Sequence, residues 1–145
     1  MPYNILSIPG GTTRYDDCPR ISVTGGGNTS VSVTVTYHAA LVPPGTRATL
    51  GEVVFSDVLE IRWIDCDVSY EEYSQHEDDY EFGLIEVLDS AYIETMASRG
   101  VYRDRPGNRI RGNPEAAVRH FRMGFDKWGD LNVIATKFSV RELVE

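Results

Sequence analysis

The sequence predicts a mainly β fold of the α+β class: a β-sandwich or open barrel with one well-defined helix and a C-terminal β-hairpin. Residues 30–41 alternate between apolar and polar or small side chains, which is typical of a half-buried strand. Residues 89–100 carry helix signals at both ends, and residues 118–140 form two apolar runs around a turn that contains glycine. Because no linker rich in Pro, Gly or Ser interrupts the 145 residues, we expect a single domain, residues 1–145.

The N-terminal half of the chain predicts three strands. Residues 3–8 form the first, which Pro9-Gly10-Gly11 ends, and residues 21–24 form a second, shorter one. A turn at residues 25–28 leads into the third and strongest, whose apolar face consists of Val31, Val33, Val35, Tyr37, Ala39 and Leu41.

A further strand or strand pair is expected from Thr49 to Ile64. One face would carry Phe55, Asp57, Leu59, Ile61 and Trp63, and the other Val54, Ser56, Val58, Glu60 and Arg62. The first face is mostly apolar, so it is predicted to be the core face, with Asp57 near a bend.

The C-terminal half predicts one helix and one hairpin. Asp89 is the expected N-cap of a helix over Ser90–Arg99 that Gly100 ends, with Tyr92, Ile93 and Met96 on its apolar side. A second helical turn is expected at Asn113-Pro114, after an arginine-rich loop over residues 101–112. In the hairpin, residues 118–125 and 131–140 are the strands, and Gly129 is the left-handed residue of the loop.

The charge distribution suggests a binding role. A net charge of −8 disfavours nonspecific binding to nucleic acid, and residues 65–94 contain eleven acids and no Lys or Arg. Tyrosines, which are enriched at interface cores, lie among these acids. The residues predicted to contact a basic protein partner are Asp65, Asp67, Tyr70, Glu71, Glu72, Tyr73, Glu77, Asp78, Asp79 and Tyr80. The alternative is a solvated acidic loop.

Five arginines carry the opposite charge, and they allow two interpretations: Arg99, Arg103, Arg105, Arg109 and Arg111. The favoured one is that they pair with the acidic segment inside the fold, which would partly neutralise it. The other is that they form an anion-binding arm.

No complete set of catalytic or metal-binding residues is evident. His38, His76 and His120 do not stand at metal-ligand spacing, so neither metal nor cofactor is expected. No local carboxylate and nucleophile accompany His120, so a structural or surface role is predicted for it, and no catalytic residue is assigned. Cys18 and Cys66 are expected to be reduced thiols.

The N-terminus has no basic region followed by a long apolar run, and no stretch approaches the ~20 apolar residues of a membrane span. We therefore expect a cytoplasmic protein without membrane contact.

Residues 119–126 and 129–135 are similar to the closing hairpin of small uncharacterised bacterial proteins, and residues 86–90 with the helix that follows are similar too. Some such proteins resemble the immunity proteins that accompany polymorphic secreted toxins. The resemblance implies a cytoplasmic antidote that binds one toxin domain, and it carries over no binding residue, because the similar residues are fold residues.

The leading hypothesis is thus an immunity-type inhibitor whose residues 65–81 occlude a basic toxin site. A second hypothesis is a small-molecule or lipid-binding β domain with a pocket lined by Trp63, Tyr37 and Phe121. A third is an enzyme that uses carboxylates with His76 or His120, which predicts a cleft where a histidine meets a carboxylate and a nucleophile.

Overall fold

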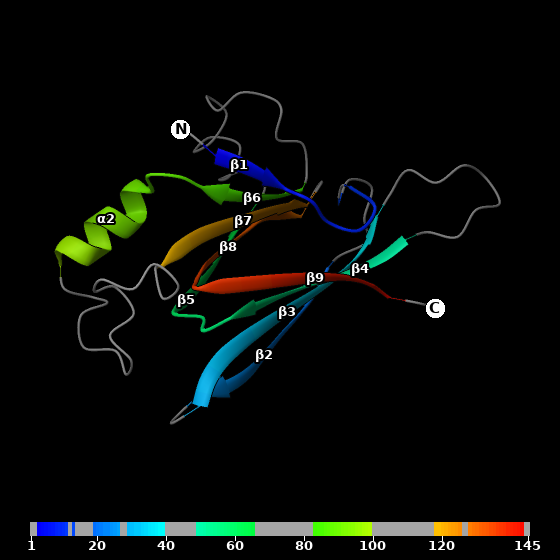
Figure 1. Cartoon of the computed structure of the whole chain (residues 1–145), viewed down its shortest axis with the longest axis horizontal. Helices are drawn as coiled ribbons and strands as arrows, with labels where there is room; N and C mark the ends of the chain where they lie inside the picture. The colour runs from blue at the N-terminus through cyan, green and yellow to red at the C-terminus, as the bar shows by residue number, and fades with distance from the viewer. Residues whose placement is uncertain are drawn as a thin grey trace.

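Two antiparallel sheets and one short helix make up the computed structural model, which describes residues 3–11, 13, 19–26, 29–39, 49–65, 83–99, 118–125 and 128–143 (Figure 1). In chain order the elements are β1 (Tyr3–Leu6), β2 (Arg20–Gly26), β3 (Thr29–Ala39), β4 (Thr49–Ser56), β5 (Glu60–Asp65), β6 (Leu84–Val87), α2 (Ala91–Ser98), β7 (Arg119–Phe125), β8 (Gly129–Ala135) and β9 (Lys137–Leu143).

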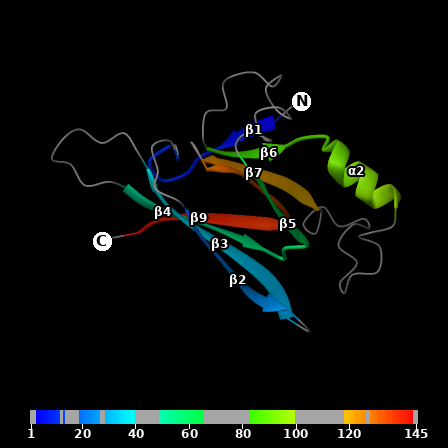
Figure 2. The same cartoon turned by 180° about the vertical axis from the view of Figure 1, so that it is seen from behind.

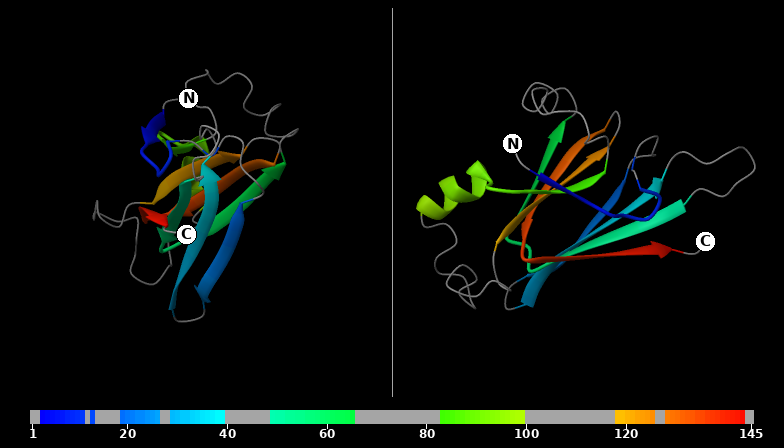
Figure 3. Two further views of the ribbon diagram at one scale, coloured as in Figure 1. Left: turned by 90° about the vertical axis from the view of Figure 1, so that its right-hand side faces the viewer. Right: turned by 45° about the horizontal axis from the view of Figure 1, so that its top comes forward.

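The sheets form two layers that do not close into a barrel, so the predicted mainly β class with one helix is confirmed. One sheet has the order β1-β6-β7-β8-β5 and the other the order β2-β3-β4-β9. Figure 2 shows α2 beyond the end of β6, and the right-hand view in Figure 3 shows it outside the space between the layers.

The chain passes directly from one sheet to the other at two adjacent points. Between β4 and β5 it bends at Asp57, which has a φ of 53°, and between β8 and β9 it passes through Thr136. The Thr136 amide donates to the Ser56 carbonyl (3.3 Å), and its hydroxyl donates to the Asp57 carboxylate (3.1 Å). The predicted bend at Asp57 is confirmed, whereas the single strand predicted over residues 131–140 is wrong, since β9 pairs with β4.

The core between the sheets follows the alternation of the sequence. Val33, Val35 and Tyr37 of β3 are fully buried, as predicted, and the Tyr37 hydroxyl donates to the Pro9 carbonyl (2.8 Å). The Phe121 ring packs against Phe55 from the opposite sheet, with centroids 5.3 Å apart. Burying each such side chain stabilises the fold by about 1.5–3 kcal/mol.

The predicted core face of residues 55–63 is only partly correct. Phe55 is buried, but Ile61 and Trp63 are each 42% exposed. Trp63 lies opposite Leu131 of β8 and stacks on Phe125 at 6.0 Å, so it does face the interior. It stays exposed because β5 is the edge strand of its sheet.

The hairpin of β7 and β8 is confirmed by continuous pairing from Arg119↔Ala135 to Phe125↔Gly129. Gly129 has a φ of 134°, as its predicted role requires, and a side chain there would collide with the carbonyl oxygen of Ile64. Nearly all residues of both strands are buried, which means that the hairpin is covered on both faces.

The helix begins one residue later than predicted. Ser90, not Asp89, is the N-cap, because its hydroxyl accepts from the Ile93 amide (3.2 Å), while Asp89 adopts a φ of 49°. The prediction missed β6, a four-residue strand that pairs with β1 and β7. Gly100, the turn at residues 113–114 and the loop over residues 101–112 lie outside the described residues.

Candidate functional site

The five-stranded sheet buries polar side chains on the face that points away from the other sheet. Phe121 faces the core, and successive residues of a strand point to opposite faces, so His120 and Arg122 project from the outer face. Residues paired across two strands share a face, which places Asp130 and Asn132 of β8 on the outer face too. All four are at least nine-tenths buried. Buried polar groups are costly unless they are hydrogen-bonded, so their partners identify what this face does.

Two of these groups, His120 and Asn132, form a hydrogen-bonded chain with Ser90. The Ser90 hydroxyl lies 2.8 Å from Nδ1 of His120, and Nε2 of His120 lies 2.8 Å from Oδ1 of Asn132. Ser90 comes from the turn before α2, His120 from β7 and Asn132 from β8. The pairings of β6 with β7 and of β7 with β8 therefore bring together residues 30 and 12 positions apart.

The protons in this chain have a defined order. An amide oxygen only accepts, so Nε2 of His120 carries the ring proton, and Nδ1 is left to accept from the Ser90 hydroxyl. Burial lowers the pKa of His120, the Asn132 hydrogen bond opposes that shift, and the charge of Arg122 adds to it. The imidazole is therefore neutral near pH 7, in the tautomer that takes a proton from Ser90.

Further polar groups surround the histidine. The Tyr92 ring stands edge-on to the imidazole at 6.2 Å, and its hydroxyl donates to Glu60. Arg122 forms an ion pair with Asp130. The amide nitrogen of Asn132 is buried and has no hydrogen-bond partner within the described part of the chain.

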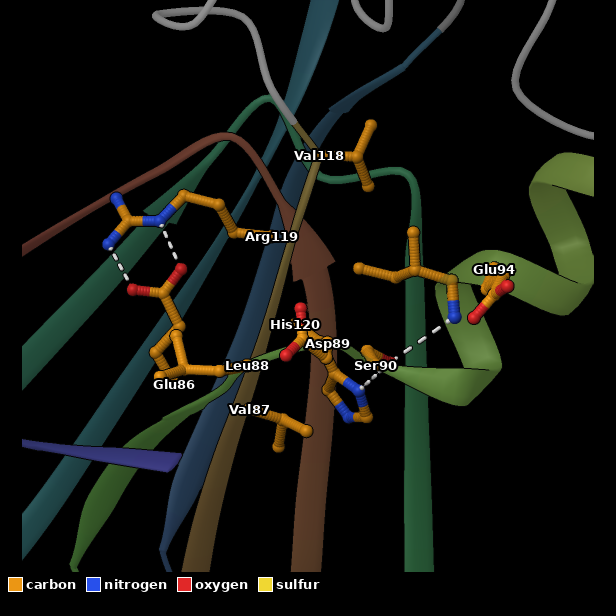
Figure 4. Close-up of a pocket in the computed structure, with 10 residues that line it drawn as sticks. Glu86, Val87, Leu88, Asp89, Ser90, Glu94, Val118, Arg119 and His120 are labelled. Carbon is orange, nitrogen blue, oxygen red and sulfur yellow. Dashed lines mark hydrogen bonds and ion pairs between the residues drawn. The ribbon is translucent and has the colours of Figure 1, made fainter. Parts of the chain in front are cut away.

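A pocket of about 330 Å³ opens beside Ser90 and His120, where β6 ends and β7 begins (Figure 4). Figure 4 shows the Ser90–His120 contact on one side of this pocket and the Arg119–Glu86 pair on the other. Arg119 makes two hydrogen bonds to Glu86 (2.7 and 2.8 Å), and this contact raises the pKa of Arg119.

Comparisons with protein-family models, with curated proteins and with solved structures found no match. The site is therefore interpreted from its own geometry. Across the described ranges, no three His, Cys, Asp or Glu side chains are grouped so as to hold a metal ion. Nor does that part of the chain contain a helix long and apolar enough to cross a membrane.

Of the ten residues predicted to contact a partner, the structure describes Asp65, which is exposed at the end of β5. The others lie outside the described residues: Asp67, Tyr70, Glu71, Glu72, Tyr73, Glu77, Asp78, Asp79 and Tyr80. The described residues that flank this segment lie at one end of the sheet, because Asp65 pairs with Gly129 and the Gly83 carbonyl accepts from the amide of Gly124.

The arginine-rich segment begins and ends at the opposite end of that sheet. Arg99 follows α2, whose N-cap contacts His120, and Val118 directly precedes β7. The two segments thus start from opposite ends of β7, and seven residues of strand span about 20 Å.

The pocket predicted for a small molecule does not have the expected lining. Tyr37 and Phe121 are packed in the core, and Trp63 covers Phe125 at the sheet edge. His38 is partly exposed on β3, whereas His76, Cys18 and Cys66 lie outside the described residues.

Sequence reasoning missed Ser90 and Asn132 as partners of His120, because both are distant along the chain. A usable signal was present in the hairpin. His120 and Arg122 alternate with apolar residues in one strand, and Asp130 and Asn132 do so in the next. Such alternation predicts a polar face shared by both strands.

Proposed function

We propose that this chain is an immunity-type inhibitor that binds a cognate secreted toxin domain in the cytoplasm and occludes its basic active site. The observation that carries the proposal is the edge strand β5, which presents Ile61 and Trp63 and runs directly into the acidic segment at Asp65. Apolar and aromatic anchors beside a polar rim are typical of protein–protein interfaces.

The two parts of this surface would contribute differently to binding. A half-exposed Trp becomes a strong contact once a partner excludes water from it, since Trp is enriched among the residues that dominate binding energy. The acids would speed association with a basic groove and select against acidic partners.

The proposal requires that the arginine-rich segment leaves this negative charge available to a partner. Residues 66–82 and 100–117 lie outside the described residues, so this requirement stays a prediction.

The direct test measures binding of the purified chain to the toxin-like domain encoded by the neighbouring gene, by calorimetry at low and high salt. We expect a complex whose affinity falls as salt rises. No binding at micromolar concentration would refute the proposal.

Matched variants locate the surface. The pair Asp78→Asn/Asp79→Asn should weaken binding about tenfold or more, whereas Glu52→Gln/Glu142→Gln, which removes the same charge from the other sheet, should not. Ile61→Ser should also weaken binding, but Ile5→Ser should not, because Ile5 is exposed on the opposite edge strand β1. Equal effects of the paired variants would place the contact elsewhere.

A further inference from the structure

The hydrogen-bonded side chains of Ser90, His120 and Asn132 place a hydroxyl, a neutral imidazole and an amide in the order that nucleophilic hydrolases use. We propose that this pocket is an acyl-transfer site, in which Ser90 is the nucleophile, His120 is the general base and Asn132 is a positioning residue. This activity goes beyond the proposed inhibitor function and does not depend on it.

The direction of each hydrogen bond supports these roles. Nδ1 of His120 accepts from Ser90 because Nε2 donates to Asn132, so the base is unprotonated on the side of the nucleophile. The Ser90 oxygen also accepts from the Ile93 amide (3.2 Å), which would stabilise the negative charge that grows on that oxygen as the proton leaves.

The local backbone presents Ser90 to the pocket. Strand β6 ends at Val87, and the chain turns at Asp89, which has a left-handed backbone conformation, before α2 begins. Ser90 therefore lies on a tight strand-to-helix turn, and it lines the pocket together with His120. The amide nitrogen of Asn132 is buried and has no hydrogen-bond partner among the described residues, and a buried amide group left in this state costs about 1–3 kcal/mol.

The reaction is balanced without a metal or a further cofactor. The Ser90 oxygen bonds to the carbonyl carbon of an ester while its proton passes to Nδ1 of His120. The carbon–oxygen bond to the alcohol then breaks, and that proton goes to the departing alkoxide. Water, deprotonated by His120 in turn, releases the acid and restores the Ser90 hydroxyl.

The pocket lining defines the class of substrate. Three carboxylates, those of Glu86, Asp89 and Glu94, line the pocket against one cation, Arg119, so anionic esters are disfavoured. Val87 and Ile93 provide apolar wall, and about 330 Å³ suits a small ligand. The expected substrates are small esters that are neutral or positively charged.

The first experiment treats the wild-type chain with an uncharged alkyl fluorophosphonate, which phosphonylates activated serines with loss of fluoride. Intact mass and peptide mapping should show one adduct, on Ser90. Ser90→Ala should abolish it, and His120→Gln should slow its formation by about 10²–10⁴-fold. Ser98→Ala is the matched control and should label as the wild type does, since this exposed serine of α2 donates to the Thr95 carbonyl of the same helix.

The second experiment follows hydrolysis of p-nitrophenyl butyrate against pH to test Asn132. Asn132→Asp keeps the acceptor for Nε2 and adds a negative charge, so it should raise the pKa of the base and move the acid limb of the rate profile upward. Asn132→Ala should lower the rate without that shift.

Absence of an adduct on folded wild-type protein would overturn the proposal, as would an adduct that survives Ser90→Ala. In either case, the hydrogen-bonded chain only fastens α2 to the sheet.

Discussion

Replacing Ser90 by alanine tests the structural side of the hydrogen-bonded chain. The substitution removes the N-cap of α2, which costs about 1 kcal/mol, and the loss of a hydrogen-bonded cap rarely exceeds about 2 kcal/mol. It also leaves Nδ1 of His120 buried without its donor, which costs about 1–3 kcal/mol. The free energy of unfolding should therefore fall by about 2–4 kcal/mol.

Urea unfolding followed by tryptophan fluorescence measures this loss as a lower midpoint at unchanged slope. Ser98→Ala serves as the control and should stay within about 0.5 kcal/mol of the wild type, because the Ser98 side chain is exposed. Hydrogen exchange of the α2 amides separates the two contributions, since loss of the cap acts on the helix alone and loss of the histidine contact acts on the sheet.

A double-mutant cycle with His120→Leu isolates the contact between the two side chains. Because Ser90 and His120 are in direct contact, their effects should be non-additive by about 0.5–3 kcal/mol. Additive effects, or a loss below about 1 kcal/mol for Ser90→Ala alone, would show that the hydroxyl and the imidazole are not bonded.

Three further perturbations test the groups around the hydrogen-bonded Ser90, His120 and Asn132 side chains. Burial lowers the pKa of His120 below its ordinary value of 6.5. As pH falls below 6.5, the unfolded chain therefore binds a proton at His120 that the folded chain does not bind. The free energy of unfolding should fall as pH decreases. Urea midpoints against pH measure this fall, and His120→Leu should remove it; an unchanged profile would contradict the shift. Asp130→Ala should cost about 3–5 kcal/mol in the same assay because it removes one member of a buried ion pair, whereas Glu52→Ala, whose partner Arg141 is exposed, should cost at most about 1 kcal/mol. Asp89→Val should cost about 1–2 kcal/mol and Asp89→Gly should not, because φ is 49° there; equal costs would exclude backbone strain as the cause.

The strand predictions were correct where the alternation of residues within one strand is enough to determine which side chains are buried. Val33, Val35 and Tyr37 belong to β3, which pairs with a strand on each side, so alternation in the sequence became burial in the fold. The same reasoning failed for Ile61 and Trp63, because whether an edge strand is covered depends on the width of the opposite sheet. Strand β6 was missed because four residues are too few to show a period.

The helix and the last strand show a similar limit. Asp and Ser are both favourable N-cap residues, so residue type does not decide between Asp89 and Ser90. In the structure Ser90 is the cap, and its hydroxyl also contacts His120. Residues 131–140 form one apolar run in the sequence, yet the chain passes from one sheet to the other at Thr136. There Thr136 donates hydrogen bonds to Ser56 and Asp57, which lie where the chain passes between the sheets from β4 to β5.

The sequence by itself determined the fold class, the main strands, the bend at Asp57 and the turn at Gly129, because each depends on neighbouring residues and on their allowed backbone angles. Only the tertiary structure decided which polar residues meet. Ser90, His120 and Asn132 come together because β7 pairs with both β6 and β8, and contacts between distant segments leave no local pattern.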